Sequence, residues 1–472
     1  MFVLRKREPK RCDCVSRGGC RATVGHTPFW GPGGAQIGLA RTTHGGRRAR
    51  KVVRTGAPRG PQKGVSPESL SGGLLGRGPF ITELSRSELA VYHRRAASRL
   101  DPSAAGSDIG LMPAPMRVID AASAESYLRQ TGRIAPDEQV TIRELSGGVS
   151  NVVLYVACSP AGREDFVLKQ SRDRLRVEDP WFCSVERIWR EVEVLRLCET
   201  LLADDSGERQ LVIKTPWILF EDRENFAFAM TAAPPEHVVW KSELLAGRVK
   251  PEISAACGRL LGRMHAGTWR DGAVASRFGD RQFFDDLRID PFYRHIADVH
   301  EHLRPAVKRL IESGWAHAEC LVHGDFSPKN LLVYDDGLMM VDCEAGHYGD
   351  PAFDVGFFLS HLVLKAFCRA PDFERFLAIS DTFCEAYHGE LAHRVSEQER
   401  RSLTARAVRN FAGCALARLD GKSKVSYLRC AARRDAIRTL CVKILHTPPP
   451  VWKDVLDLAR THLTALEDDL SS

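Results

Sequence analysis

Residues 321–354 read LVHGDFSPKNLLVYDDGLMMVDCEAGHYGDPAFD, and this stretch decides the fold that we predict for the chain. Its first two residues end an apolar run. The triplet His323-Gly324-Asp325 then breaks that run with a glycine that lets the backbone turn sharply. Because the chain turns here, we expect Asp325 to lie on a loop and not in the core.

A hairpin is predicted directly after this loop. The apolar run 331–334, the acidic turn Asp335-Asp336-Gly337 and the returning run 338–341 supply its strands and its reversal. Asn330 opens the first strand and Asp342 ends the second, so we expect their side-chain oxygens side by side, as a hard Mg²⁺ ion prefers. A carboxylate that orients an acceptor hydroxyl and ligands for a metal are what phosphoryl transfer chiefly requires of a protein. An ordinary hairpin with a polar end is the alternative.

The spacing of these residues resembles a known signature. HGDxxxxN, followed by D-x-E and then by FD, is similar to the pattern of the aminoglycoside phosphotransferase and choline kinase family, whose fold is like that of protein kinases. The resemblance implies a catalytic base, metal ligands and residues that support the catalytic loop. The catalytic base would be Asp325. The metal ligands would be Asn330 and Asp342, with Glu344 near the metal. His323 and Asp354 would support the loop, and Asp354 would brace it from beneath.

A kinase also needs a glycine loop, a phosphate lysine and a glutamate that fixes the lysine. Residues 139–145 and 151–158 predict two strands joined by the tight turn 146–150, which reads SGGVS. Glycines there let backbone N–H groups approach phosphate oxygens, although hairpins use such a pair routinely. The residues expected to touch the nucleotide are Gly147, Gly148 and Ser150.

Lys169 is the expected phosphate lysine. It lies in the apolar strand 166–170, where a charge usually needs a partner. Apolar residues recur at helical spacing over 184–200, which predicts an amphipathic helix beside that strand. Glu191 on this helix is the expected partner, and Glu193 is its rival. The alternative for Lys169 is a surface lysine on an edge strand.

Two short strands, 219–221 and 226–230, are expected to close the small lobe around an acidic turn. The resemblance implies that the next residues form a hinge whose backbone groups bind the nucleotide base. A simple interlobe linker ending at Pro234-Pro235 predicts the same composition. The hinge residues are Met230, which faces the base pocket, and Thr231, Ala232 and Ala233.

The remainder of the chain is predicted to be helical. We therefore predict an α+β, two-lobed fold of the protein-kinase-like type, with a small antiparallel β N-terminal nucleotide-binding lobe over 116–233. A large helical C-terminal catalytic and substrate lobe follows over 234–472, and the nucleotide belongs between the two. His265 is expected to be a helix-capping residue and not a ligand. The expected helices span 253–267, 296–315, 353–367, 373–388, 397–419, 427–445 and 451–466.

The first 115 residues differ in composition from the rest. They hold 20 Lys and Arg against 7 Asp and Glu, a net charge of +13, so the remaining chain carries 47 against 53, or −6. They also hold 18 of the 38 glycines and few apolar runs, and we predict a disordered basic arm. Three hypotheses for the arm are an organelle transit peptide, a segment that binds nucleic acid or anionic lipid, and untranslated sequence before a start at Met112 or Met116. Nucleic acid is not favoured as a partner.

The fourteen cysteines support neither disulfides nor a zinc site, because no Cys-x-x-Cys pair occurs and most lie in apolar segments. We expect free thiols and a reducing compartment, the cytoplasm. Arg5-Lys6-Arg7 interrupts the first apolar residues, so no secretory signal is visible. No membrane span is expected either, since the run Val355 to Val363 is the nearest in length and reads as a buried helix.

The acceptor is less well marked than the reaction. Within the family, several short segments look most like the methylthioribose kinase branch. The paired arginines of that branch would fall near Ala417-Arg418, where only one arginine is present, and this counts against methylthioribose itself. A carboxylate pocket for a cationic acceptor is one interpretation of Asp285, Asp286, Asp290 and Tyr293, and a solvated helix face is the favoured one. The branch-like segments are Lys169-Gln170, Arg176-Val177, Trp181, Glu186-Arg187, Asp342-Cys343-Glu344 and Phe411-Ala412-Gly413.

We therefore expect a Mg²⁺-dependent kinase that transfers the γ-phosphate of ATP or GTP to a hydroxyl of a small polar acceptor, such as a sugar, an aminoglycoside or an amino alcohol. One alternative is a nucleotide-binding pseudokinase or regulatory module without turnover. Another is a protein kinase, which is disfavoured because no Asp-Phe-Gly or Ala-Pro-Glu segment frames an activation loop.

Overall fold

The structure is a computed structural model that describes residues 116–145, 148, 150–159, 163–176, 181–203 and 211–471, without the side chains of 467–471. All of these residues belong to Ile109–Ser472, the second of two units into which the chain divides. The predictions for the arm over 1–115 and for Gly147 therefore lie outside the described residues.

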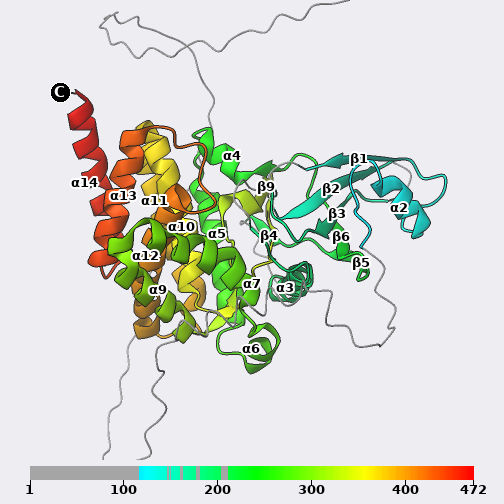
Figure 1. The fold of residues 1–472 in the computed structure, drawn as a ribbon, viewed down its shortest axis with the longest axis horizontal. Helices are drawn as coiled ribbons and strands as arrows, with labels where there is room; N and C mark the ends of the chain where they lie inside the picture. Colours follow the sequence, from blue (N-terminus) through cyan, green and yellow to red (C-terminus); the bar gives the residue numbers. More distant parts are fainter. Residues whose placement is uncertain are drawn as a thin grey trace, which may run out of the picture. The chain divides into compact units, whose positions relative to one another are not determined.

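The small lobe is built on an antiparallel five-stranded sheet, with helix α2 (Ala124–Gln130) on one face and α3 (Arg187–Leu201) on the other (Figure 1). Successive side chains of a strand point to opposite faces. Phe166 and Leu168 pack with α2, whereas Val167 faces α3. Lys169, two residues further on, is directed to the α3 side as well. In spatial order the strands are β1 (Val140–Glu144), β2 (Asn151–Cys158), β3 (Phe166–Ser171), β6 (Ala227–Thr231) and β5 (Ile218–Asp222).

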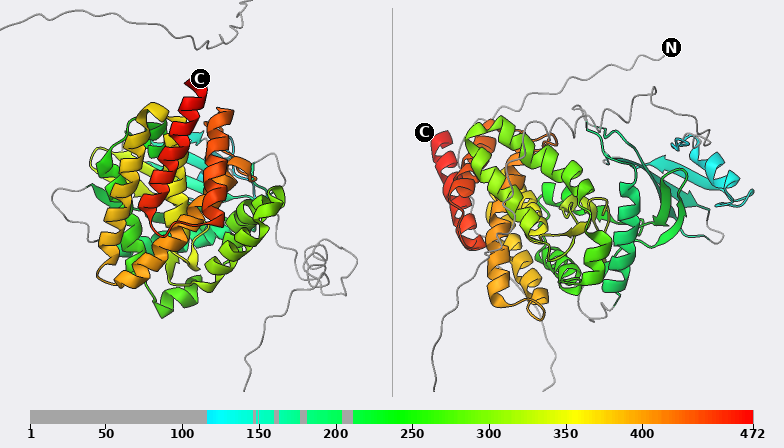
Figure 2. Two further views of the ribbon diagram at one scale, coloured as in Figure 1. Left: turned by 90° about the vertical axis from the view of Figure 1, so that its left-hand side faces the viewer. Right: turned by 60° about the horizontal axis from the view of Figure 1, so that its bottom comes forward.

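Helices form the large lobe around a buried central helix, α10 (Ala352–Cys368). Its side chains from 352 to 367 are all buried, and it packs against α11 (Phe373–Leu391), α12 (Glu397–Asp420) and α13 (Ala431–His446). Figures 1 and 2 show α13 and α14 (Trp452–Ser471), orange to red, on the side of this lobe that faces away from the sheet. The other helices are α4 (Trp240–Leu245), α5 (Pro251–Gly267), α6 (Gly272–Phe278), α7 (Gln282–Phe284), the π-helix η2 (Asp285–Arg294), α8 (His295–Val299) and α9 (Arg304–Ala316).

The prediction of one continuous helix over 296–315 is wrong. Helix α8 ends at Val299, a short 3-10 turn follows, and α9 begins at Arg304. Pro305 lies in the first turn of α9, the only part of a helix that tolerates a residue without a backbone N–H. The proline therefore starts a new helix where the apolar spacing suggested continuation.

The predicted hairpin after the loop that carries Asp325 is confirmed, with β9 (Leu331–Tyr334) antiparallel to β10 (Gly337–Met340). Two further strands extend it, because β10 pairs in parallel with β4 (Val212–Lys214) and β9 pairs with β7 (Val238–Val239). On the other side of the loop, β8 (Cys320–Val322) pairs with β11 (His347–Gly349). The loop between Val322 and Leu331 is thus held at both ends by sheet hydrogen bonds.

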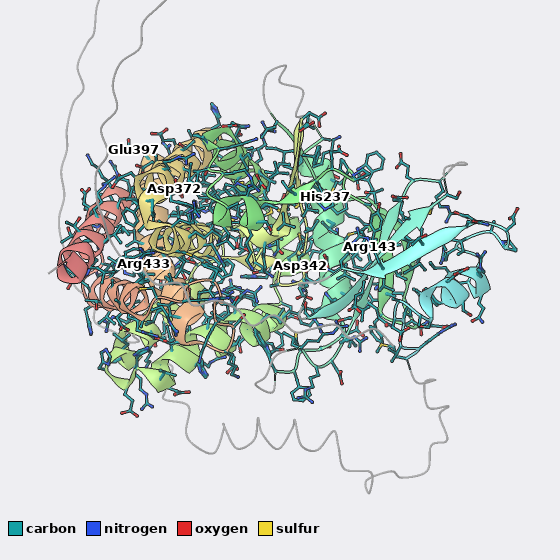
Figure 3. All side chains as sticks on the ribbon, turned by 90° about the horizontal axis from the view of Figure 1, so that it is seen from above. Arg143, His237, Asp342, Asp372, Glu397 and Arg433 are labelled. Carbon is teal, nitrogen blue, oxygen red and sulfur yellow. The ribbon has the colours of Figure 1, made fainter. Side chains whose placement is uncertain are left out.

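The predicted two-lobed α+β fold of the protein-kinase-like type is confirmed by this arrangement. The cysteines in the described part of the chain are free thiols, as expected. Within the same residues, no helix combines the length and the apolar character that crossing a bilayer requires. The loop that carries Asp325 and the end of β10 belong to the helical lobe, and Figure 3 shows Asp342 where that lobe meets the sheet.

Candidate active site

The carboxylate of Asp354 fixes the loop that carries Asp325. Asp354 lies fully buried in the first turn of α10. Its Oδ2 accepts a hydrogen bond from the His323 N–H at 2.7 Å, and its Oδ1 accepts one from the Gly324 N–H at 2.9 Å. The ring Nδ1 of His323 in turn accepts from the Asp325 N–H at 3.1 Å. This geometry agrees with the bracing position that the resemblance implies for Asp354.

His265 supports Asp354 from α5, and the prediction that it is a capping residue is wrong. Its Nε2 lies 3.3 Å from Asp354 Oδ2, and its Nδ1 lies 2.9 Å from the hydroxyl of Tyr387 on α11. All three side chains are buried. Burial favours the protonated acid, but the hydrogen bond and charge of His265 lower the pKa of Asp354. The carboxylate therefore stays ionised as the acceptor of the loop amides.

Gly324→Ala is expected to lower the free energy of unfolding by about 2 kcal/mol or more. Gly324 has a φ of +76°, and a Cβ there would lie 2.6 Å from the carbonyl oxygen of Ala345. Gly314→Ala in α9 is the matched control, since no atom lies within 4 Å of its added Cβ and helix propensity predicts a gain of about 0.5–1 kcal/mol. Urea unfolding measures both variants, and wild-type stability of Gly324→Ala would contradict this loop geometry.

Asp325 is buried and is held by two cations that come from different elements. Its Oδ1 lies 2.9 Å from Arg288 Nη2 on η2, and its Oδ2 lies 2.7 Å from Lys329 Nζ. Arg288 also donates from Nε to the Gly324 carbonyl oxygen at 2.7 Å. Burial works against the charged carboxylate, but Arg288 and Lys329 outweigh it and lower the pKa of Asp325. Asp325 is therefore a carboxylate at neutral pH, as a hydroxyl-orienting group requires.

Asn330 and Asp342 lie at the open end of the hairpin, as the sequence predicts. Asn330 Nδ2 donates to the carbonyl oxygen and to Oδ2 of Asp325, at 3.0 and 2.9 Å, which leaves its amide oxygen for another partner. Asp342 has a φ of +70°, a conformation that is uncommon outside glycine and that clusters at functional sites. Its Oδ2 lies 3.6 Å from Lys329 Nζ, so one ammonium group is shared between Asp325 and Asp342.

Lys169 joins the sheet to the catalytic loop through a buried ion-pair network. Its Nζ lies 2.7 Å from both carboxylate oxygens of Glu191 and 2.9 Å from Asp342 Oδ1. Glu193, the rival for this role, is partly exposed and lies 3.8 Å from Arg277 instead. Burial disfavours the ammonium form, but Asp342 and Glu191 raise the pKa of Lys169 above its usual value. Burial also favours the acid form of Asp342, yet Lys169 and Lys329 hold the pKa of that carboxyl well below its usual range.

Glu344 is engaged by Arg187, a fully buried residue at the start of α3. Arg187 Nε and Asn151 Nδ2 both donate to Glu344 Oε2, each at 3.0 Å. Arg187 also donates from Nη2 to the carbonyl oxygen of Ser150, at the end of the predicted glycine loop. This arginine therefore links the glycine loop, α3 and the segment after β10. The role of Glu344 as a metal ligand stays a prediction.

The predicted nucleotide residues line the sheet side of the site. Gly148 is exposed, and Ser150 is buried beside Arg187. At the predicted hinge, the Thr231 and Ala232 N–H groups donate to the carbonyl oxygens of Trp217 and Asp165. Those two amides have protein partners already, and Met230 is buried in the core between the lobes. Their contacts with a nucleotide stay predictions.

The sequence did not reveal that Arg288 and Tyr293 are buried. Arg288 had no predicted role, and it contacts Asp325. Tyr293 is buried and donates to Asn410 Oδ1 at 2.7 Å, so the solvated-face interpretation is wrong for it. Asp285 and Asp290 do lie near the surface, where they pair with Arg294 and Lys422. An arginine between two apolar residues, Leu287 and Ile289, was the available signal.

Comparison with known proteins places these residues in a family context. Residues 141–397 match the profile of the phosphotransferase enzyme family, and this range holds every candidate site residue named above. The methylthioribose kinase of Yersinia pseudotuberculosis serotype O:3 is 29% identical over 278 residues, which cover 53% of this chain and 65% of that protein. The methylthioribose kinase of Pectobacterium atrosepticum is 27% identical over 286 residues, 54% of this chain and 68% of that protein. The chain thus matches slightly less than two thirds of the length of the first of these curated relatives.

A crystal structure of a choline/ethanolamine kinase family protein from Mesorhizobium loti is also similar. It shares 17% sequence identity with a TM-score of 0.40, and the match covers 71% of this chain and 99% of that one. A likeness of this strength supports no conclusion about substrate.

Proposed function

Because the chain belongs to the phosphotransferase enzyme family, we propose that it is a small-molecule kinase. It transfers the γ-phosphoryl group of ATP or GTP to a hydroxyl group of a small polar acceptor. The observation that carries the proposal is the convergence of Lys169, Asp325 and Asp342 on one buried network of ion pairs. A pseudokinase would usually lack one of these three residues.

Asp325 is the residue that receives the acceptor hydroxyl. The acceptor oxygen forms a bond to the γ-phosphorus, the bond from that phosphorus to the β–γ bridging oxygen breaks, and the hydroxyl proton passes to the Asp325 carboxylate. Because Arg288 and Lys329 lower the pKa of Asp325, it is a weak base that mainly orients the hydroxyl. Arg288 and Asn330 keep the carboxylate in place, since each contacts a different oxygen of it.

The residues at the end of the hairpin fit a Mg²⁺ ion. The amide oxygen of Asn330 and the carboxylate of Asp342 offer the oxygen ligands that this hard cation prefers, and Lys329 shows that positive charge is accommodated between Asp325 and Asp342. When bound, the ion would neutralise charge on the transferring phosphates. Asn151 and Arg187 both donate to Oε2 of Glu344, so Oε1 is the oxygen that Glu344 would offer to the metal directly or through water.

The nucleotide would bind between the proposed lobes over 116–233 and 234–472. Lys169 would contact its phosphates while Glu191 holds the lysine in position, as the 2.7 Å contacts allow. At the hinge, the amide of Ala233 would bind the base, because the amides of Thr231 and Ala232 have protein partners.

The free thiols of the described cysteines fit a reducing compartment, the cytoplasm.

An acceptor screen tests this proposal. Wild-type protein is incubated with Mg²⁺ and ATP or GTP against sugars, sugar phosphates, amino alcohols and aminoglycosides, and acceptor-dependent nucleotide consumption is measured. We expect at least one acceptor class to stimulate consumption, and the Asp325→Asn variant to lower the stimulated rate by about 10²–10⁴-fold. Nucleotide binding by calorimetry without stimulation by any acceptor would instead support the pseudokinase alternative.

A further inference from the structure

A cationic pocket lies in the helical lobe beside the candidate active site. It is a cavity of about 60 Å³, several times the roughly 10–15 Å³ that one ordered water needs. Five cations line it, and the other lining residues are His361, Val425, Ser426 and Tyr427. The cations are Lys241 on α4, Lys365 on α10, Arg418 on α12, Lys329 on the 3-10 turn η4 (Pro328–Asn330) and Lys424 in the loop before α13. The lining therefore comes from elements that are far apart in the sequence.

Several polar atoms that line this pocket are buried without a protein partner. Within the described residues, His361 Nε2, Arg418 Nε and the Tyr427 hydroxyl make no hydrogen bond. Lys365 is only 1% exposed, and its Nζ donates to the carbonyl oxygen of His361 at 3.0 Å. Buried polar groups normally have hydrogen-bond partners. Several unpaired polar atoms around one cavity therefore indicate a bound ligand that supplies the missing hydrogen bonds.

Three cations of the pocket have no carboxylate partner in the protein. In the part of the chain that the structure describes, no carboxylate lies within ion-pair distance of Lys241, Lys365 or Arg418. Burial and the neighbouring cations Lys241 and Arg418 lower the pKa of Lys365 well below its usual value. A buried lysine without a carboxylate destabilises a folded protein, so its presence calls for a function.

Lys329 connects this pocket to the catalytic aspartate. It lines the pocket, and its Nζ lies 2.7 Å from Asp325 Oδ2. Burial lowers the pKa of Arg418, against the smaller opposing effects of Tyr427 and Asp325. The residues expected to hold the nucleotide phosphates, by contrast, lie on the sheet side of the site around Lys169. The pocket is therefore placed for the acceptor and not for the nucleotide.

We infer that this pocket binds an oxyanion carried by the acceptor, so that the substrate is a hydroxyl compound bearing a phosphate, sulfonate or carboxylate group. The inference rests on the proposed function and narrows its substrate class. The anion would take the hydrogen bonds that Arg418, Tyr427 and His361 offer, while a hydroxyl of the same molecule reaches Asp325. Cationic acceptors such as aminoglycosides and choline are disfavoured, since the pocket would repel them.

Lys365→Met tests the pocket without relying on turnover. Methionine keeps the volume of the side chain and removes the unbalanced charge, so we expect the melting temperature of the free protein to rise by about 2–4 °C. Inorganic phosphate is the probe, added with a saturating non-hydrolysable ATP analogue and Mg²⁺ so that the nucleotide site is filled. It should raise the melting temperature of the wild type in a saturable way, and this shift should be lost in Lys365→Met.

Lys308→Met on α9 is the matched control, because Lys308 is an exposed lysine paired with Glu312 on the same helix. It should keep the wild-type phosphate shift. Arg418→Met supplies a second variant and should also lose the shift. A phosphate shift that survives in both Lys365→Met and Arg418→Met, or that disappears when the ATP analogue is added to the wild type, would overturn the inference.

Matched acceptors separate this inference from the proposed function. We expect kcat/KM for a sugar phosphate to exceed that for the same sugar without phosphate by at least about tenfold. This factor corresponds to the free energy that a hydrogen bond to a charged group contributes. Turnover of neutral sugars with no preference for their phosphates would overturn the anion pocket and leave the kinase function standing. A lack of turnover with every acceptor would count against the kinase function. The change in melting temperature on adding phosphate would still show whether the pocket binds an anion.

Discussion

Asp325→Asn is expected to lower kcat by about 10²–10⁴-fold while the affinity for the magnesium–nucleotide complex stays close to that of the wild type. Asparagine preserves the shape of the side chain but cannot take the hydroxyl proton or attract it by charge. The nucleotide contacts assigned to Lys169 and to the hinge lie on the other side of the site, so they are left in place. Single-turnover rates and calorimetry with a non-hydrolysable nucleotide measure the two effects separately.

The same variant also removes a charge from a buried cluster. Arg288 and Lys329 each lose an ionised partner, so the free energy of unfolding should be measured alongside activity. Asp335→Asn, at the exposed turn of the neighbouring hairpin, is the matched control and should keep wild-type turnover. If folded Asp325→Asn protein turned over at the wild-type rate, Asp325 would have no role in the chemical step.

Asp342→Asn is expected to lower kcat/KM by at least about 100-fold and to raise the concentration of Mg²⁺ needed for half-maximal activity. The substitution removes the negative charge that would hold the metal and that also neutralises Lys169. Asparagine tolerates the left-handed backbone conformation of this residue, with its φ of +70°, so the loss reports charge and not strain. Initial rates as a function of Mg²⁺ concentration at fixed nucleotide measure the effect.

Asp336→Asn is the control for this second variant, because Asp336 lies exposed at the opposite end of the same hairpin. It should leave the dependence on Mg²⁺ unchanged. An Asp342→Asn enzyme with the wild-type dependence on Mg²⁺ would remove Asp342 from the metal site. It would also leave its unusual backbone conformation without a functional explanation.

Local sequence patterns predicted a partner for Lys169 on the following helix, and the family resemblance favoured Glu191 over Glu193 as that partner. A lysine inside an apolar strand needs a partner, and the strand alternation that buries Phe166 and Leu168 on one face directs Lys169 to the other. Helical spacing then placed a glutamate on the element that covers that face. The observed contacts of 2.7 Å agree with this reasoning. The hairpin was predictable for a similar reason, because turn chemistry and two apolar runs lie within one short segment.

Contacts between distant elements could not be predicted in the same way. Arg288 lies on a π-helix, whose side chains do not follow the 3.6-residue spacing used to assign faces, so it was not separated from its exposed neighbours. His265 was interpreted from its position at a helix end, whereas its partners come from α10 and α11. The cationic pocket is a further case, since Lys241, Lys365 and Arg418 meet only when three helices pack together.

The central claim is that this chain moves a phosphoryl group onto a hydroxyl of a small acceptor with Asp325 as the orienting carboxylate. The most direct test is mass spectrometry of the acceptor after incubation with Mg²⁺ and a nucleotide whose γ-phosphate carries an isotopic label. The account predicts a labelled phosphorylated acceptor with the wild type and none above background with Asp325→Asn. Labelled acceptor in equal amounts from both proteins, or bound nucleotide that never transfers its label to any acceptor, would contradict it.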